Sequence, residues 1–401
     1  FGNGSANGST SFTGRGIYKS TDPDHNTYAQ ISSTIPTNGN SITAPWAFVN
    51  KIACDPNNPN RMYAATNNGL RSTDDGGGSW IWPIKLTSGA DNTLFSSDVD
   101  VASDGTVIAA VGSSSSNSVK CYVSPNGDDD TFINQSSSGT GDLPSSGISR
   151  VECAVAPSNP SYMYASIAKN DGTLYGIYRS TDKGDQWEVI GPGGSTSFQP
   201  FSSQGWYDNT IAVYPTNPNR IFVGGIDMWE WNYQGNWVHK SLWYLSSTSS
   251  YYIHADQHVY VFHPTNPDIM YIGSDGGVSR SIDGANTFNT MNINYNTVQS
   301  YAMACSPLGW IMTGSQDNGT MLLPRIGAFP KHGYSVMGGD GGWSVFSYIN
   351  PNAFFATVYN GGAKRSPDAG NNFYPQSYSD GLNPFFSTRM DPTGAPNPGD
   401  P

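Results

Sequence analysis

The chain has 401 residues and a formal net charge of −12, and only 12% of its residues are charged. Glycine (46) and proline (27) are abundant, and no long stretch shows the 3.6-residue periodicity of an amphipathic helix. These properties argue against a mainly helical protein. They also argue against a nucleic-acid partner, which needs a basic surface, and against a membrane-spanning helix, which needs a long apolar run.

The first element that recurs along the chain is a pair of short apolar strands joined by a P-x-N-P turn. We predict this hairpin at 52–66, 153–167, 211–225 and 260–274. Short runs rich in β-branched and aromatic residues, bounded by proline and asparagine, are typical of strands and tight turns.

A second hairpin follows the first and ends in a turn of the form S-x-D-x-G-x-x-W, with Trp or Phe closing it. Its copies are RSTDDGGGSW (71–80), RSTDKGDQW (179–187), RSIDGANTF (280–288) and RSPDAGNNF (365–373). The aspartate accepts backbone hydrogen bonds, the glycine takes positive φ, and the aromatic ring fills apolar space between strands. We assign a structural role to Ser72, Asp74, Trp80, Ser180, Asp182, Gly184, Trp187, Ser281, Asp283, Phe288, Ser366, Asp368, Gly370 and Phe373. Four copies at four separate rims cannot converge on one substrate.

Together the two hairpins make one four-stranded repeat. Degenerate copies at 18–28, 122–132, 228–237 and 315–329 bring the total to seven complete repeats and one split between the chain ends. A four-stranded unit repeated radially is the blade of a β-propeller. We therefore expect residues 1–401 to form a single all-β propeller with seven or eight four-stranded antiparallel blades. An open β-solenoid and two separate sandwiches are the alternatives.

The closing turn is identified as an Asp-box, or BNR repeat. Together with SQGWYDN (203–209), HADQH (254–258), GSQDNGT (314–320) and GGDGGW (338–343), it resembles secreted BNR/sortilin-like propeller proteins of Bacteroidetes-type bacteria. More distantly it is similar to xyloglucan-active glycoside hydrolases, sialidases and sortilin-type receptors. The resemblance implies a propeller, secretion to the outside or the cell surface, and further C-terminal modules beyond this chain. It implies no single activity.

Residues that break the repeat are the best candidates for a site. His254, Asp256 and His258 are spaced by two, so on a strand they would share one face and could bind a transition metal or form an acid/base cluster. We expect Asp208, Asp275, Asp317 and Asp340 to join them in one polar cluster. Three roles stay open: satisfying buried groups at blade junctions, binding calcium or another divalent cation, or forming a ligand or catalytic pocket.

The aromatic residues favour a binding function. The densest run, 228–252, and Trp206 could present platforms for a sugar ring or a protein partner. We predict ligand binding by His254, Asp256, His258, Asp208, Asp317 and Trp206, and hence an exported or cell-surface binding or assembly module for a glycan or protein. The cofactor that the sequence allows is calcium or another divalent cation.

The alternative is a glycoside hydrolase. Its catalytic candidates are Asp256, Asp275 and Asp340, because such enzymes use two carboxyl groups about 5–10 Å apart. The xyloglucan-active enzymes place theirs across two propellers, so a one-propeller chain would need a partner domain or another geometry. A sialidase is not expected, because the repeat arginines all stand beside the closing turns.

The four cysteines contain no C-x-x-C pair, which argues against a zinc or thioredoxin-like site. A disulfide between Cys121 and Cys153 is one pairing that the sequence allows.

Overall fold

The computed structural model describes residues 13–376 except for 23, 25, 38–40, 113–118, 194–196, 234–235, 293–297, 299, 324–332, 348, 351, 359–361 and 370. It divides into two compact units. The first comprises 1–274 and 278–291, and the second comprises 275–277 and 292–401. Each unit is described by itself below. The segment 387–401, where the sequence predicts a further first strand, lies outside the described residues.

The described chain is all-β apart from one short 3₁₀ helix, η1 (Ser32–Thr34). In the first unit the strands of successive sheets are β1 (Tyr18–Lys19) and β2 (Ala29–Gln30); β3 (Val49–Cys54), β4 (Met62–Thr66) and β5 (Gly69–Thr73); β6 (Ser96–Val101), β7 (Val107–Val111), β8 (Lys120–Ser124) and β9 (Ile133–Asn134); β10 (Ile148–Val155), β11 (Met163–Lys169), β12 (Leu174–Ser180) and β13 (Glu188–Gly191); β14 (Thr210–Val213), β15 (Ile221–Gly224), β16 (Trp229–Trp231) and β17 (Trp237–His239); and β18 (Gln257–Phe262), β19 (Met270–Ser274), β20 (Gly277–Ser281) and β21 (Asn289–Thr290).

The second unit holds two sheets. Their strands are β22 (Ser300–Cys305), β23 (Ile311–Ser315), β24 (Gly319–Leu323) and β25 (Tyr334–Met337); and β26 (Gly341–Phe346), β27 (Phe354–Val358), β28 (Gly362–Ser366) and β29 (Tyr374–Gln376). In every sheet of both units the strands follow chain order, and every strand pairing given is antiparallel.

Six of the eight sheets are therefore four-stranded meanders. The sheet of β3, β4 and β5 is extended by a bridge between Ser72 and Ile81, which takes the place of a fourth strand. The P-x-N-P turns join first to second strands at β3–β4, β10–β11, β14–β15 and β18–β19, and the S-x-D turns follow third strands. The predicted all-β, four-stranded propeller-blade class is confirmed.

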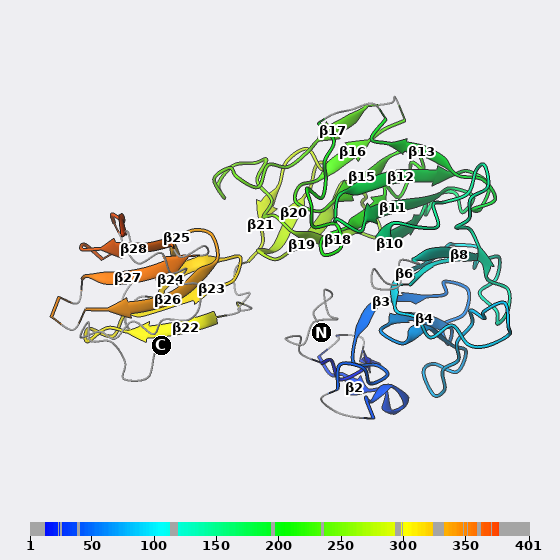
Figure 1. The fold of residues 1–401 in the computed structure, drawn as a ribbon, viewed down its shortest axis with the longest axis horizontal. Helices are drawn as coiled ribbons and strands as arrows, with labels where there is room; N and C mark the ends of the chain where they lie inside the picture. Colours follow the sequence, from blue (N-terminus) through cyan, green and yellow to red (C-terminus); the bar gives the residue numbers. More distant parts are fainter. Residues whose placement is uncertain are drawn as a thin grey trace. The chain divides into compact units, whose positions relative to one another are not determined.

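Within each unit, from β3 onward, the first strands of successive sheets lie next to one another (Figure 1). In the first unit β3 contacts β6, β6 contacts β10, β10 contacts β14, and β14 contacts β18; in the second unit β22 contacts β26. Contact between first strands is what radial packing of blades requires.

The cores lie between consecutive sheets, so both faces of an inner blade are buried. Along β10, Val151 and Cys153 pack toward the sheet before it, whereas Ala154 packs toward the sheet after it. Such strands read as continuous apolar runs because neither face meets water. Full burial of one aliphatic side chain stabilises the fold by about 1.5–3 kcal/mol.

Carboxylates tie neighbouring first strands where no ladder hydrogen bonds run between them. Asp98 Oδ2 on β6 accepts the N–H of Cys153 on β10 at 2.7 Å, and Asp100 Oδ2 accepts that of Val155 at 2.8 Å. Lys51 Nζ on β3 lies 3.3 Å from Asp98 Oδ1. These side chains satisfy backbone donors that the radial arrangement leaves without a strand partner.

The disulfide allowed by the sequence is not formed. Cys121 on β8 and Cys153 on β10 are both buried and both free thiols. A hydrogen bond with Cys121, followed by burial, raises the pKa of Cys153, so Cys153 stays a protonated thiol inside the core between these two sheets.

Candidate functional site

The polar residues of the first unit meet just before two neighbouring first strands. Asp208 lies two residues before β14, and Asp256 directly precedes β18. Because β14 contacts β18, their preceding segments come together. Gln204 bridges them: its Nε2 donates to Asp256 Oδ1 at 2.6 Å and to Asp208 Oδ2 at 3.2 Å. Gln204, Asp208 and Asp256 form what we call the carboxyl cluster.

The two carboxyl groups of this cluster have different environments. Asp208 is fully buried, whereas Asp256 is partly exposed. Burial, with the neighbouring charge of Asp256 and a hydrogen bond to it, raises the pKa of Asp208 to about 9. Asp208 Oδ1 receives no hydrogen bond from a described protein donor, so nothing in its surroundings offsets the cost of a charge on this oxygen. At neutral pH Asp208 is therefore the neutral partner.

Aromatic rings adjoin the carboxyl cluster. Trp206 is 50% exposed, and its ring centroid lies 5.8 Å from that of Tyr207. The Tyr207 ring in turn meets the His258 ring edge-on at 4.9 Å. Trp206 thus carries a half-exposed indole on the same short segment as Gln204 and Asp208, and an indole of this kind offers an apolar face to a ligand.

The predicted transition-metal site at His254, Asp256 and His258 is not formed. Their ligand atoms do not come within 4.8 Å of one another as a group. The prediction assumed one continuous strand, but β18 begins only at Gln257, Asp256 has φ of 60°, and the ladder is irregular between Gln257 and Val259. These breaks disturb the two-residue alternation. His254 Nδ1 lies 3.0 Å from Ala255 O.

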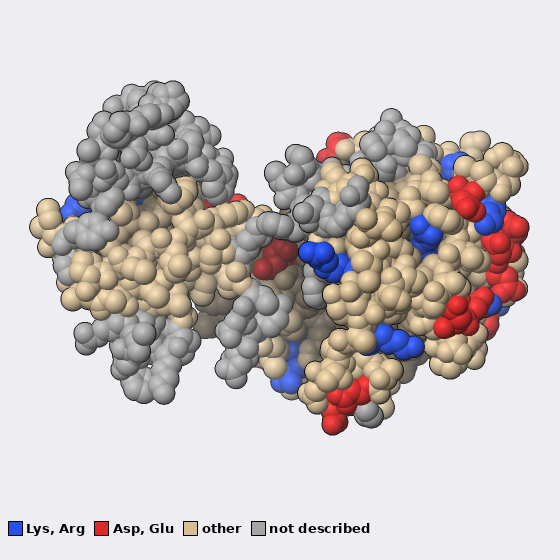
Figure 2. Space-filling view, turned by 90° about the horizontal axis from the view of Figure 1, so that it is seen from below, with Lys and Arg blue, Asp and Glu red and all other residues tan. Residues whose placement is uncertain are grey.

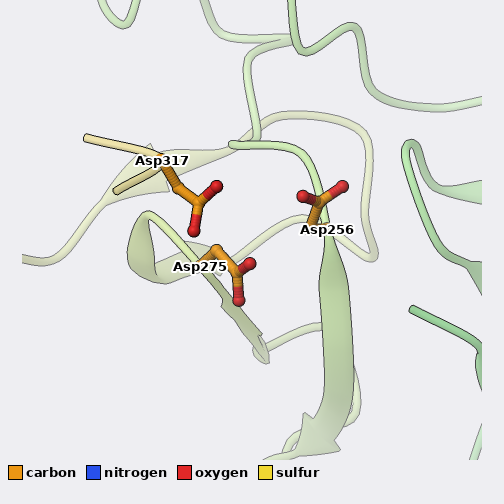
Figure 3. A group of neighbouring side chains, drawn as sticks. All are labelled: Asp256, Asp275 and Asp317. Atoms are coloured by element: carbon orange, nitrogen blue, oxygen red, sulfur yellow. The ribbon is translucent and has the colours of Figure 1, made fainter. Parts of the chain in front are cut away.

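The second unit contains its own acidic group (Figure 3). Carboxylate oxygens of Asp275 and Asp317 lie within 4.8 Å of each other, and Asp340 Oδ1 accepts the N–H of Asp317 at 2.9 Å. Asn318 Nδ2 donates to Asp275 O at 3.1 Å. Oxygen-only ligands of this kind suit a hard cation such as calcium better than a softer metal. Asp275 and Asp317 are thus the residues of this unit that could hold one.

The repeated turns are hydrogen-bonded locally. Ser180 Oγ donates to Asp182 Oδ1 at 2.7 Å and accepts the N–H of Gly184 at 2.8 Å, while Gln186 N–H donates to Asp182 Oδ1 at 2.9 Å. Gly184 has φ of 93°, which a residue with a side chain rarely adopts. The same bonds from a side-chain hydroxyl to an aspartate recur at Ser281 with Asp283 and at Ser366 with Asp368. Gly370 lies outside the described residues.

The first turn is shifted by one residue from the predicted frame. Thr73 Oγ1 donates to Asp75 Oδ1 at 2.7 Å and accepts the N–H of Gly77 at 3.1 Å, so Thr73 and Asp75 take the places assigned to Ser72 and Asp74. Asp74 instead pairs with Arg61. The reason is spacing: the closing ring is seven residues after the hydroxyl in the other turns, and Trp80 is seven residues after Thr73.

The sequence predicts Asp208, Asp256 and Trp206 as site residues, whereas Gln204 and Tyr207 become apparent only in the structure. Gln204 makes the contact that joins the two carboxyl groups, and Tyr207 links Trp206 to His258. Both stand in SQGWYDN, the segment that interrupts the repeat, so their position there was the available signal.

Fold and site together define the class: an all-β protein of propeller blades with a polar cluster where two first strands begin. No family model matches the chain, and no curated protein matches it. Three similar solved structures are a GH74 enzyme of Niastella koreensis (18% identity, TM-score 0.46), a GH74 xyloglucanase of Xanthomonas campestris (14%, 0.39), and PorZ, a surface component of the type-IX secretion system of Porphyromonas gingivalis (14%, 0.45).

The chain is covered to 92%, 92% and 83% in these alignments, but it spans only 64%, 63% and 40% of the three proteins. At such identities and TM-scores the likeness says nothing about activity.

Proposed function

We propose that this protein is an exported or cell-surface binding module, and that its ligand is a glycan bound at Trp206 and the carboxyl cluster. The observation that carries the proposal is the bridge from Gln204 to both Asp208 and Asp256, which fixes Asp256 against the segment 204–208 that carries the half-exposed Trp206. Trp206 supplies a face for a sugar ring, and Asp256 supplies acceptors for its hydroxyl groups.

The geometry of the carboxyl cluster favours binding over hydrolysis. A glycoside hydrolase keeps its two carboxyl groups about 5–10 Å apart so that the scissile bond, and in inverting enzymes a water, fits between them. One amide nitrogen, Gln204 Nε2, donates to both Asp208 and Asp256 and so occupies the space between the two carboxyl groups. Asp208 is also fully buried and so cannot reach a substrate bond.

Surface charge agrees with a neutral ligand. On the face of the first unit shown in Figure 2, the described Lys and Arg side chains are scattered singly, several of them beside Asp or Glu. Among the described residues no helix is long and apolar enough to cross a bilayer.

The test is a glycan array followed by titration calorimetry of the full chain with the glycans captured. Trp206→Ala should weaken binding at least about tenfold, because a central aromatic contact is worth roughly 1.4 kcal/mol or more. Asp256→Asn should weaken it as well, since the charged acceptor is lost. Tyr28→Ala, which removes an aromatic side chain that is 61% exposed elsewhere in the first unit, is the control and should bind like the wild type.

Unchanged affinity in a folded Trp206→Ala variant would contradict this site. Release of reducing sugar by the wild type, lost in a folded Asp256→Asn variant, would support the hydrolase alternative instead.

A further inference from the structure

A second group of exposed aromatic side chains lies in the first unit, on the segment between β17 and β18. Trp243, Tyr244 and Tyr251 are 50%, 64% and 55% exposed. The Trp243 and Tyr244 rings meet edge-on with centroids 6.1 Å apart. We call residues 241–252 the aromatic loop. Folding gains nothing from aromatic faces left in water, so their presence on one short loop points to a ligand.

The aromatic loop is held in place by a buried carboxylate. Asp227 is 6% exposed, and its Oδ1 accepts the Trp243 N–H at 3.0 Å and the Ser241 hydroxyl at 3.1 Å. Its Oδ2 lies 3.1 Å from His239 Nε2, and the His239 ring stacks on Trp229 at 4.1 Å. The start of the aromatic loop, at Ser241 and Trp243, is thus anchored to the sheet of β14–β17.

Backbone hydrogen bonds close the rest of the loop. Leu242 N–H donates to Tyr251 O at 2.9 Å, and Ser249 N–H donates to Ser246 O at 2.8 Å. Phe288 N–H, in the closing turn of the next sheet, donates to Ser250 O at 2.8 Å. A platform fixed in this way loses little conformational entropy when a ligand binds.

The composition of the aromatic loop identifies the ligand class. Residues 241–253 include no Asp, Glu, Lys, Arg or His, while five serines and one threonine stand among the aromatic residues. Rings with polar edges, surrounded by neutral hydroxyl groups, match the apolar faces and hydroxyl rims of neutral sugar rings. Anionic ligands would need a basic side chain that this stretch lacks.

We propose that the aromatic loop is a second carbohydrate-binding platform, with Trp243 and Tyr244 as its stacking residues and neutral polysaccharide as its ligand. It shares no residue with the Trp206 site. The inference rests on the proposed function only in the ligand class. Two platforms on one protein would raise the avidity for a long chain, provided that the chain can reach both.

The test is affinity electrophoresis of the full chain in gels containing hydroxyethylcellulose, galactomannan or arabinoxylan, with alginate as the acidic comparison. Trp243→Ala and Trp243→Ala/Tyr244→Ala should weaken retardation by at least one neutral polysaccharide about tenfold or more. Trp243→Phe keeps an aromatic ring and should therefore retain most of the retardation. Thermal melting of each variant should match the wild type, because the side chains are exposed.

The outcomes separate the two sites. If Trp206→Ala loses retardation by the polysaccharide while the Trp243→Ala/Tyr244→Ala variant is retarded like the wild type, the second platform is overturned. The Trp206 site would then stand. If only the Trp243 variants lose retardation, the result would support the second platform and contradict the Trp206 site. A wild type that none of the neutral polysaccharides retards would overturn both.

Discussion

At the scale of single residues, the protonation of Asp208 is the property that burial decides. Its pKa of about 9 lies far above that of an exposed aspartate, which is near 4. Between these two values the folded state holds a proton that the unfolded state has released. The free energy of unfolding must therefore fall as pH rises through this window.

Asp208→Asn should remove this dependence, because an amide is neutral throughout. Relative to the wild type, the variant should gain stability from pH 5 to pH 9, by at most about 1.4 kcal/mol per pH unit. Urea unfolding at pH 5, 7 and 9 measures the free energy of unfolding of the variant and of the wild type. Asp185→Asn, at an exposed aspartate, is the matched control and should track the wild type. If the free energy of unfolding of Asp208→Asn and of the wild type changed with pH in parallel, Asp208 would be ionised in the folded state.

At the scale of elements, the closing turns show how a local pattern stabilises a strand pair. In the turn after β20, burial alone would raise the pKa of Asp283, but hydrogen bonds from Thr287, Ser281 and Asn286 outweigh it and lower the pKa to about 2. The carboxylate thus serves as an acceptor for the turn, as the S-x-D spacing predicts. In the turn after β5 the same bonds start one residue later, at Thr73.

The shifted frame is tested by exchanging the two neighbouring aspartates. Asp75→Ala should lower the melting temperature by about 2–4 °C, because the turn loses the acceptor for Ser79 and Thr73. Asp74→Ala should lower the melting temperature by less, because it removes only an ion pair with Arg61 at the surface. A larger decrease in melting temperature for Asp74→Ala than for Asp75→Ala would show that the turn uses Ser72 and Asp74 instead. Thermal melting followed by circular dichroism measures both.

At the scale of the whole molecule, the repeats continue from the first unit into the second with the same strand order. Within each unit the cores lie between consecutive sheets. Blades that share cores with their neighbours cannot unfold alone without exposing apolar faces. The repeat count from the sequence predicts one propeller over the whole chain, which should behave as one cooperative unit.

Scanning calorimetry of the full chain should accordingly show a single transition, with equal calorimetric and van't Hoff enthalpies. Phe354→Ala in the second unit and Ile167→Ala in the first remove fully buried side chains at a cost of about 2–5 kcal/mol each. Each should shift the whole transition to lower temperature. Two transitions, only one of which moves in each variant, would contradict the single propeller.

The sequence by itself determined the strands, the two kinds of turn and the blade class, because these depend on neighbours a few residues apart. P-x-N-P and S-x-D turns close through their own backbone, and apolar runs mark strands buried on both faces. The one-residue error at Thr73 arose because serine and threonine can each serve as the turn hydroxyl.

Only the tertiary structure decided which polar residues meet. Gln204 and Asp208 reach Asp256 because β14 packs beside β18, a contact that no local pattern encodes. His254, Asp256 and His258 fail to converge because Asp256 takes a left-handed conformation and β18 is irregular at its start. Burial then sets the proton on Asp208, since the cost of a charge depends on everything packed around it.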